Sequence, residues 1–91
     1  MRRIASTAKR LENAVQQITM QRIQDRLNRA RREHPEFTPQ GGGIFEALAV
    51  IAEEHGEVAA AANDDEGVAR VNDELLDLIA TGIRALQEEY K

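Results

Sequence analysis

The sequence contains no cysteine and no tryptophan, and its 91 residues include only two phenylalanines and one tyrosine. Without cysteine the chain can form neither a disulfide framework nor a thiolate site for structural zinc. Any bound metal ion must therefore be held by oxygen or imidazole ligands. The shortage of aromatic rings also limits the side chains that can stack on a nucleotide base to Phe37, Phe45, Tyr90 or an arginine.

Long apolar runs are missing as well. No segment approaches the ~20 apolar residues that a membrane-spanning helix requires, and the charged N-terminal region lacks the apolar core of a signal peptide. We therefore expect a cytoplasmic protein that does not enter a membrane. The chain is short enough to form one domain over residues 1–91. Because so small a monomer buries little of its surface, association into a homodimer or homotetramer is expected.

Charge is divided unevenly along the chain. Nine of the 12 basic residues lie in residues 1–34, whereas 13 of the 16 acidic residues lie in residues 35–91. This division is typical either of a nucleic-acid-binding arm or of a basic helix that packs against acidic ones. The arginines of the basic region surround much of the helix, and no DNA-binding motif accompanies them, so nucleic acid is not the expected partner. They are Arg22, Arg26, Arg29, Arg31 and Arg32.

Apolar residues at alternating steps of three and four predict a helical region over residues 1–33. One stripe runs from Ile4 to Ile18 and a second from Met20 to Ala30, and the two are out of phase across Thr19. Either one long helix rotates its buried face there, or two shorter helices meet. Residues 34–43 contain both prolines and three consecutive glycines, which predicts a loop.

Residues 44–91 carry the pattern of a helix pair. The first helix should run from about Ile44 to about Ala62, and Asn63 with Glu66 forms a capping box that should start the second. The predicted core positions are Ile44, Leu48, Ile51, Val58 and Ala62 on the first helix, and Val68, Val71, Leu75, Leu78, Ile79, Gly82 and Leu86 on the second. No segment has the pattern of a strand, so the predicted fold is all-α with three to four helices.

Two acidic pairs lie within these helices, Glu54-x-x-Glu57 and Glu74-x-x-Asp77. Carboxylates three positions apart project from one helix face, so two packed helices would bring four of them together. Clustered carboxylates are unfavourable without a compensating cation. An all-oxygen site suits a hard divalent ion, which predicts Mg²⁺, with Mn²⁺ as a possible substitute.

The run Glu53-Glu54-His55-Gly56-Glu57-Val58, followed by Glu74-Leu75-Leu76-Asp77, resembles the MazG-like branch of the all-α nucleoside triphosphate pyrophosphohydrolases. That group has the pattern E-E-x-x-E, a spacer, then E-x-x-D, and the resemblance covers residues 44–86. It implies a MazG-like helical bundle completed by oligomerisation. It also implies Mg²⁺-dependent cleavage of a nucleoside triphosphate between the α and β phosphates, which yields a monophosphate and pyrophosphate.

The resemblance assigns roles residue by residue. Metal ligands would be Glu54, Glu57, Glu74 and Asp77. The catalytic acids would be Glu53 and Glu54, with Glu53 either orienting water or joining the metal shell. Independently of the resemblance, Arg70 and Arg84 lie on the same side as the second pair, where they either bind substrate phosphate or form ion pairs with neighbouring carboxylates. Two other functions remain open: a non-enzymatic helical oligomerisation or interaction module, and a nucleic-acid-binding protein that uses the basic first helix.

Overall fold

Three helices make up most of the chain in the computed structural model, which describes the backbone of residues 2–91 and the side chains from Ser6 onward. They are α1 (Arg2–Glu33), α2 (Gly43–Asn63) and α3 (Val68–Leu86). No strand occurs in the described residues, which confirms the all-α prediction. None of these three helices is both long enough and apolar enough to span a bilayer.

Helix α1 continues through Thr19 without a break. The Thr19 hydroxyl donates a hydrogen bond to the Val15 carbonyl oxygen at 3.0 Å, four residues earlier, so its side chain is accommodated within the helix. Leu11, Ile18 and Met20 on either side of this point are all exposed. The change of phase in the apolar pattern therefore needs neither a kink nor a second helix, because neither stripe is packed there. Ile4 lies outside the described side chains.

The start of α2 is stabilised by Glu46. Its carboxylate accepts hydrogen bonds from the backbone N–H groups of Gly42 at 2.9 Å and Gln40 at 3.1 Å. A Cβ atom at position 42 would lie 2.8 Å from the Glu46 Cβ, so this close approach requires glycine. Gly43 has φ = 60°, a left-handed conformation that glycine adopts without strain. The glycine run thus allows the loop to turn directly into the helix.

The capping box predicted at Asn63 and Glu66 is wrong. Asn63 is the last residue of α2, and Gly67, at φ = 94°, precedes α3 without a side-chain cap. The backbone closes the turn instead, because the Asp64 N–H donates to Ala60 O at 2.9 Å and the Glu66 N–H donates to Ala61 O at 3.1 Å. Asp65 takes a left-handed conformation, and residues 64–67 separate the two helices, so the connection is longer than the capping pattern predicts.

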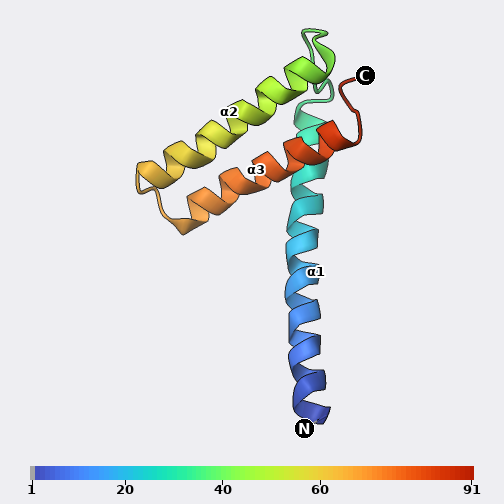
Figure 1. Cartoon of the computed structure of the whole chain (residues 1–91), viewed down its shortest axis with the longest axis vertical. Helices are drawn as coiled ribbons and strands as arrows, with labels where there is room; N and C mark the ends of the chain where they lie inside the picture. The colour runs from blue at the N-terminus through green and yellow to red at the C-terminus, as the bar shows by residue number, and fades with distance from the viewer. Residues whose placement is uncertain (1) are drawn as a thin grey trace.

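Figure 1 shows α2 and α3 lying side by side as an antiparallel pair that projects from one end of α1. Only the C-terminal part of α1 meets this pair, and it crosses α3. Arg26 connects the two helices by hydrogen bonds to Asp73 and Asp77, and Arg31 connects α1 to Glu89 beyond the end of α3. The radius of gyration is 16.6 Å, against about 12 Å for a compact domain of this length.

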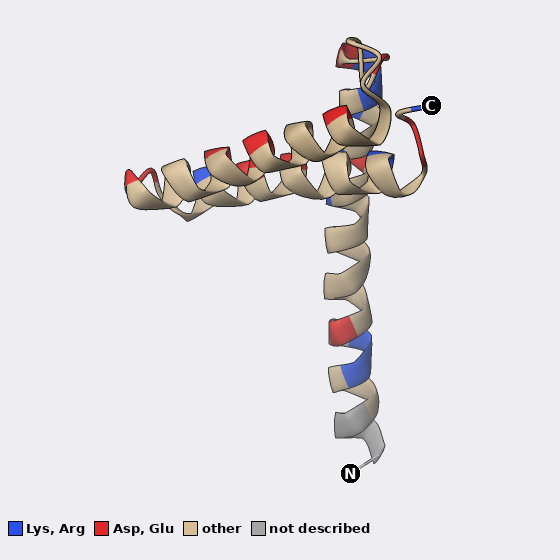
Figure 2. Ribbon diagram, turned by 45° about the horizontal axis from the view of Figure 1, so that its top comes forward, with Lys and Arg blue, Asp and Glu red and all other residues tan. Residues whose placement is uncertain are grey.

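The buried apolar side chains of the described residues are few: Leu27, Phe37, Ala47, Ala61 and Ala80. On α2 the predicted core positions Ile51 and Val58 are half-buried, but Leu48 is exposed. On α3 Leu86 is 84% exposed, although it was predicted to be buried. The predicted core faces are therefore only partly covered within one chain, because a single crossing by α1 hides one side of the α2–α3 pair. Figure 2 shows acidic residues distributed along that pair.

Candidate metal centre

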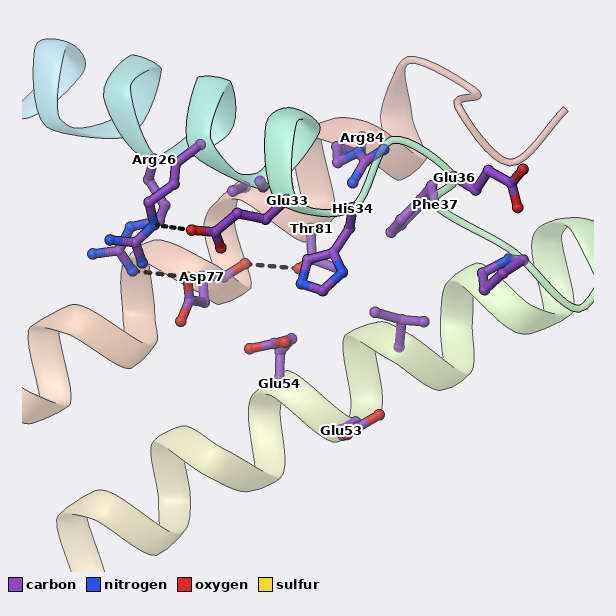
Figure 3. A pocket seen from close by; sticks show the side chains of 15 residues that line it. Arg26, Glu33, His34, Glu36, Phe37, Glu53, Glu54, Asp77, Thr81 and Arg84 are labelled. Carbon is purple, nitrogen blue, oxygen red and sulfur yellow. Dashed lines mark hydrogen bonds and ion pairs between the residues drawn. The ribbon is translucent and has the colours of Figure 1, made fainter.

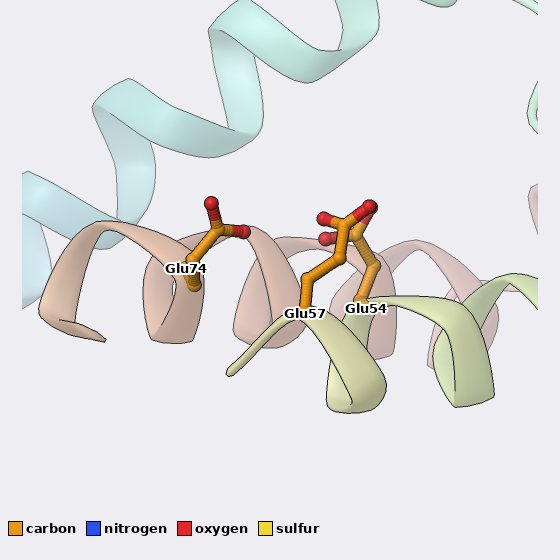
Figure 4. A group of neighbouring side chains, drawn as sticks. All are labelled: Glu54, Glu57 and Glu74. Carbon is orange, nitrogen blue, oxygen red and sulfur yellow. The ribbon is translucent and has the colours of Figure 1, made fainter. Parts of the chain in front are cut away.

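Three glutamates form the acidic cluster of the structure. Glu54 and Glu57 project from neighbouring turns of α2, and Glu74 projects toward them from α3 (Figure 4). One carboxylate oxygen from each residue lies within 4.8 Å of the other two. The three-residue spacing aligns the first two on one face of α2, and the antiparallel packing of α3 brings the third opposite them. We call these three residues the carboxylate triad.

The triad is partly removed from water. Glu74 is only 5% exposed, and Glu54 is half-buried. The Oε2 atoms of Glu54 and Glu74 are both buried and have no hydrogen-bond partner among the described residues. A buried charged oxygen without a partner is costly, so each unpaired atom indicates a missing electropositive partner.

The electrostatics agree with the geometry. Burial, together with the smaller effect of the nearby charges of Glu57, Asp77 and Glu74, raises the pKa of Glu54 from 4.5 to about 7. Burial also raises the pKa of Glu74, although the Arg70 guanidinium opposes the shift. Both carboxyls are thus poised to gain from a cation, which would favour their charged forms.

The donor set fits a hard divalent ion. All three triad side chains offer carboxylate oxygens, the ligands that Mg²⁺ and Mn²⁺ prefer, and no thiolate is present in the chain. When all three carboxyls are ionised the triad carries three negative charges, whereas in the described part of the chain a single ion pair compensates them, between Arg70 Nη2 and Glu74 Oε1 at 2.6 Å. The remaining charge and the two unpaired buried oxygens are therefore both consistent with a bound cation.

Asp77, the fourth predicted ligand, lies outside the triad. Its Oδ1 atom accepts a hydrogen bond from Arg26 Nη1 at 2.7 Å, and its backbone carbonyl accepts one from the Thr81 hydroxyl. Asp77 still faces the same cavity as Glu54 and contributes to the raised pKa of Glu54. The structure thus brings three of the four predicted ligands together and places the fourth beside them in an ion pair with α1.

A cavity of about 440 Å³ opens beside Glu54 and Asp77. It lies between the end of α1, the 34–42 loop, α2 and α3, as Figure 3 shows. Glu53 is exposed at its edge and points away from Asp77. The volume falls in the range of small-molecule sites, roughly 300–1,000 Å³. Of the three triad residues only Glu54 lines the cavity, which therefore provides room for a ligand beside that carboxylate.

The loop and α1 add further residues to the cavity lining, of which the sequence singled out only Phe37 for the site, as a possible stacking partner for a base. His34 and Phe37 come from the loop, and Arg26 and Arg29 come from α1. Phe37 is buried, and its ring lies under the Arg84 guanidinium at 4.9 Å from the centroid. For the arginines of α1, the only sequence signal was the basic stretch before the Pro/Gly loop. It does not reveal which arginine turns toward the carboxylates.

Arg70 and Arg84, predicted either to bind phosphate or to form ion pairs, are both bonded to carboxylates. Arg70 pairs with Glu74. Arg84 Nε donates to Glu89 Oε1 at 2.8 Å, and the Arg84 side chain is only 5% exposed. Arg84 lines the cavity, whereas Arg70 is not among its lining residues. In this structure both arginines therefore form the ion pairs of the second alternative.

Comparisons with protein-family models, with curated proteins and with solved structures yield no match to this chain. The fold, three helices with a projecting arm, does not by itself define an activity. Function must therefore be inferred from the triad and its cavity.

Proposed function

We propose that this protein is a Mg²⁺-dependent nucleoside triphosphate pyrophosphohydrolase that cleaves between the α and β phosphates. The observation that carries the proposal is the triad, with two unpaired buried oxygens, beside a 440 Å³ cavity. Its chemistry matches that implied by the E-E-x-x-E and E-x-x-D motifs. A polyphosphate and a divalent ion satisfy each other's charges, and carboxylates alone would repel the phosphates.

The ion would be held by Glu54, Glu57 and Glu74, with Asp77 as a further ligand once its bond to Arg26 is exchanged. When bound, Mg²⁺ or Mn²⁺ polarises phosphoryl oxygens, lowers the pKa of water and neutralises charge that develops during cleavage. No serine, cysteine or histidine nucleophile is required. The His34 imidazole and the Thr81 hydroxyl also line the cavity, but the proposal gives neither of them a nucleophilic role.

The remaining roles belong to side chains around the cavity. Glu53 is exposed at the cavity edge, where its carboxylate can accept a hydrogen bond from the attacking water and orient it. Phe37 and Arg84, which stack on each other, form one wall of the cavity, against which a base would pack. The nucleoside would thus lie toward the loop, with its phosphates toward α1 and the triad.

The test is a panel of standard and modified nucleoside triphosphates with Mg²⁺, in which released pyrophosphate is measured separately from orthophosphate. We expect pyrophosphate from at least one substrate, and a loss of at least about 100-fold in Glu57→Gln, because a ligand carboxylate becomes a neutral amide. Glu66→Gln, an exposed change in the α2–α3 turn, is the matched control. Orthophosphate alone, or activity that survives Glu57→Gln, would contradict the proposal.

Self-association is the second part of the proposal. Large apolar side chains are exposed along α1, at Leu11, Val15 and Ile18, and along the α2–α3 pair, at Leu48, Leu75 and Ile79. A second copy of the chain would cover these faces and complete a MazG-like helical bundle as a dimer or tetramer. The same exposed faces favour the alternative function, a helical interaction module without catalysis. Such a module would release no pyrophosphate in the assay above.

A further inference from the structure

A second hollow, of about 450 Å³, lies between α1 and the first half of α3. It adjoins the cavity beside the triad, because Arg26 and Arg29 line both. Its charged lining consists of Arg22, Arg26, Arg29, Arg32, Asp25 and Asp73. We call this second hollow the arginine groove.

The two neighbouring hollows have opposite charge. In the cavity five carboxylates face three guanidiniums, whereas in the arginine groove two carboxylates face four guanidiniums. The first therefore favours cations and the second favours anions. A ligand that combines bound cations with a chain of negative groups would match both, with its cationic part at the triad and its anionic end in the groove.

The arginines of the groove differ in how many ion pairs they already form with carboxylates of the chain. Arg26 has a side chain only 10% exposed, and Asp73 and Asp77 hold it in ion pairs. Arg29 is 47% exposed, and its one ion pair among the described residues reaches Glu33 at 3.8 Å, the outer limit of such a contact. Arg22 and Arg32 are exposed and have no ion pair in the described part of the chain. Three guanidiniums are thus available to an incoming anion.

We propose that Arg22, Arg29 and Arg32 bind the terminal phosphates of a polyphosphate whose cation-bound part lies at the triad. The inference rests on the proposed function and assigns the phosphate contacts to α1, because the arginines of α3 are already paired with Glu74 and Glu89. Guanidiniums bind phosphate oxygens through two parallel hydrogen bonds. From Arg22 to Arg29 the helix rises about 10 Å, which is enough for more than one phosphate group.

Arg29 has a particular place in this arrangement, since it lines both hollows. It can therefore contact the phosphate at which the two parts of the substrate meet. This position makes Arg29 a specificity determinant for triphosphates over monophosphates, because only the longer chain reaches from the triad into the groove. The pyrophosphate formed by cleavage would be the part retained by the groove.

The test uses inorganic tripolyphosphate as the probe, measured by isothermal titration calorimetry on the full chain with Mg²⁺. Arg29→Gln and the double variant Arg22→Gln/Arg32→Gln should each weaken binding about tenfold or more, the effect of losing charge-assisted hydrogen bonds. Arg29→Lys should recover part of the loss. Arg10→Gln removes the same charge from the projecting half of α1, outside both hollows, and should change affinity less than twofold. Circular dichroism checks that each variant keeps its helices.

The outcomes separate this inference from the function on which it rests. If the wild type binds Mn²⁺ and releases pyrophosphate while the groove variants bind tripolyphosphate as Arg10→Gln does, the arginine groove is overturned and the enzyme stands. If tripolyphosphate binding depends on Arg29 but no Mn²⁺ binding or turnover occurs, the anion site is supported and the proposed enzymatic function is contradicted. Retention of a single-stranded oligonucleotide through Arg22 and Arg32, with no competition from tripolyphosphate, would assign the groove to nucleic acid and overturn the proposal.

Discussion

The fold disfavours a negative charge on Glu54, because its side chain is partly buried and other carboxylates lie nearby. Its pKa is raised from 4.5 to about 7. The folded chain therefore keeps a proton that the unfolded chain releases between about pH 4.5 and pH 7. Stability contributed by this group is fully present below pH 4.5 and is lost as the pH rises through this window.

Replacing Glu54 with glutamine should therefore stabilise the metal-free protein at pH 8. The expected gain in unfolding free energy is on the order of 1–2 kcal/mol, since one pKa unit corresponds to about 1.4 kcal/mol and solvent around a half-buried group reduces the full value. Urea denaturation in EDTA at pH 8 and pH 4 measures the gain, which should vanish at pH 4. Glu53→Gln, a neighbouring exposed change, should have no effect. Equal stability of Glu54→Gln and wild type at pH 8 would contradict this.

Divalent ions should show the opposite dependence on pH. Mg²⁺ or Mn²⁺ competes with the proton on Glu54, so the increase in melting temperature on adding the ion should be large at pH 8 and should shrink as the pH falls below about 7. An ion at one hundred times its dissociation constant stabilises the fold by about 2.7 kcal/mol. Differential scanning fluorimetry with and without EDTA measures the shift, and Glu74→Gln should remove most of it. An increase in melting temperature that does not change with pH would indicate that the ion binds at a site other than the triad.

At the scale of helices, features that depend on local sequence spacing were predicted better than features that depend on contacts between distant segments. The apolar spacing placed α2 at about Ile44 to Ala62, and the observed helix runs from Gly43 to Asn63. Three-residue spacing likewise predicted that Glu54 and Glu57 share a face, because helix geometry alone determines it. The capping error at Asn63 arose because the backbone closed the turn by itself.

Contacts between residues far apart in the chain could not be predicted from the sequence alone. Arg26 meets Asp73 and Asp77, which lie 47 and 51 positions along the chain, and no local spacing indicates this. The pairing decides where α1 crosses α3. It also determines which charges line the cavity, and it separates Asp77 from the four-carboxylate site that was predicted to contain it.

Arg26 should therefore contribute strongly to the attachment of α1. Hydrogen bonds from Arg26 lower the pKa of Asp73, which shows that the pair favours both charged forms. Arg26→Met should lower the unfolding free energy by about 2–4 kcal/mol, because two partly buried carboxylates lose their partner. Urea denaturation at pH 7 tests this, with Arg22→Met, exposed one turn earlier, as the control of near-zero effect. Equal losses in the two variants would mean that apolar contacts alone dock α1.

The molecule as a whole is long and open, with extents of 57 × 33 × 20 Å. Large apolar residues on its surface belong to both the projecting arm and the α2–α3 pair. Water contact with so much apolar surface is unfavourable, by roughly 25 cal/mol for each Å² that association could bury. The shape and the surface together lead us to expect that copies of the chain associate.

Ile18→Lys should weaken that association. Ile18 is 62% exposed within one chain, so a charge there is tolerated by the monomer but would be buried between copies. Sedimentation equilibrium should show a shift toward monomer of at least about tenfold in dissociation constant. Gln17→Lys adds the same charge at the neighbouring position and should shift it less. A monomeric wild type at all concentrations would contradict the expected assembly.

The projecting arm of α1 has one further consequence. Every side chain from Ala8 to Gln21 is exposed, so this stretch of helix is not buried against any other part of the chain that the structure describes. Isolated helices of about 15 residues are marginal in water. The helical content of the arm should therefore depend on protein concentration. On dilution the arm should fray, while α2, α3 and the end of α1 stay helical. The helical ellipticity should then report the fraction of chains that are associated.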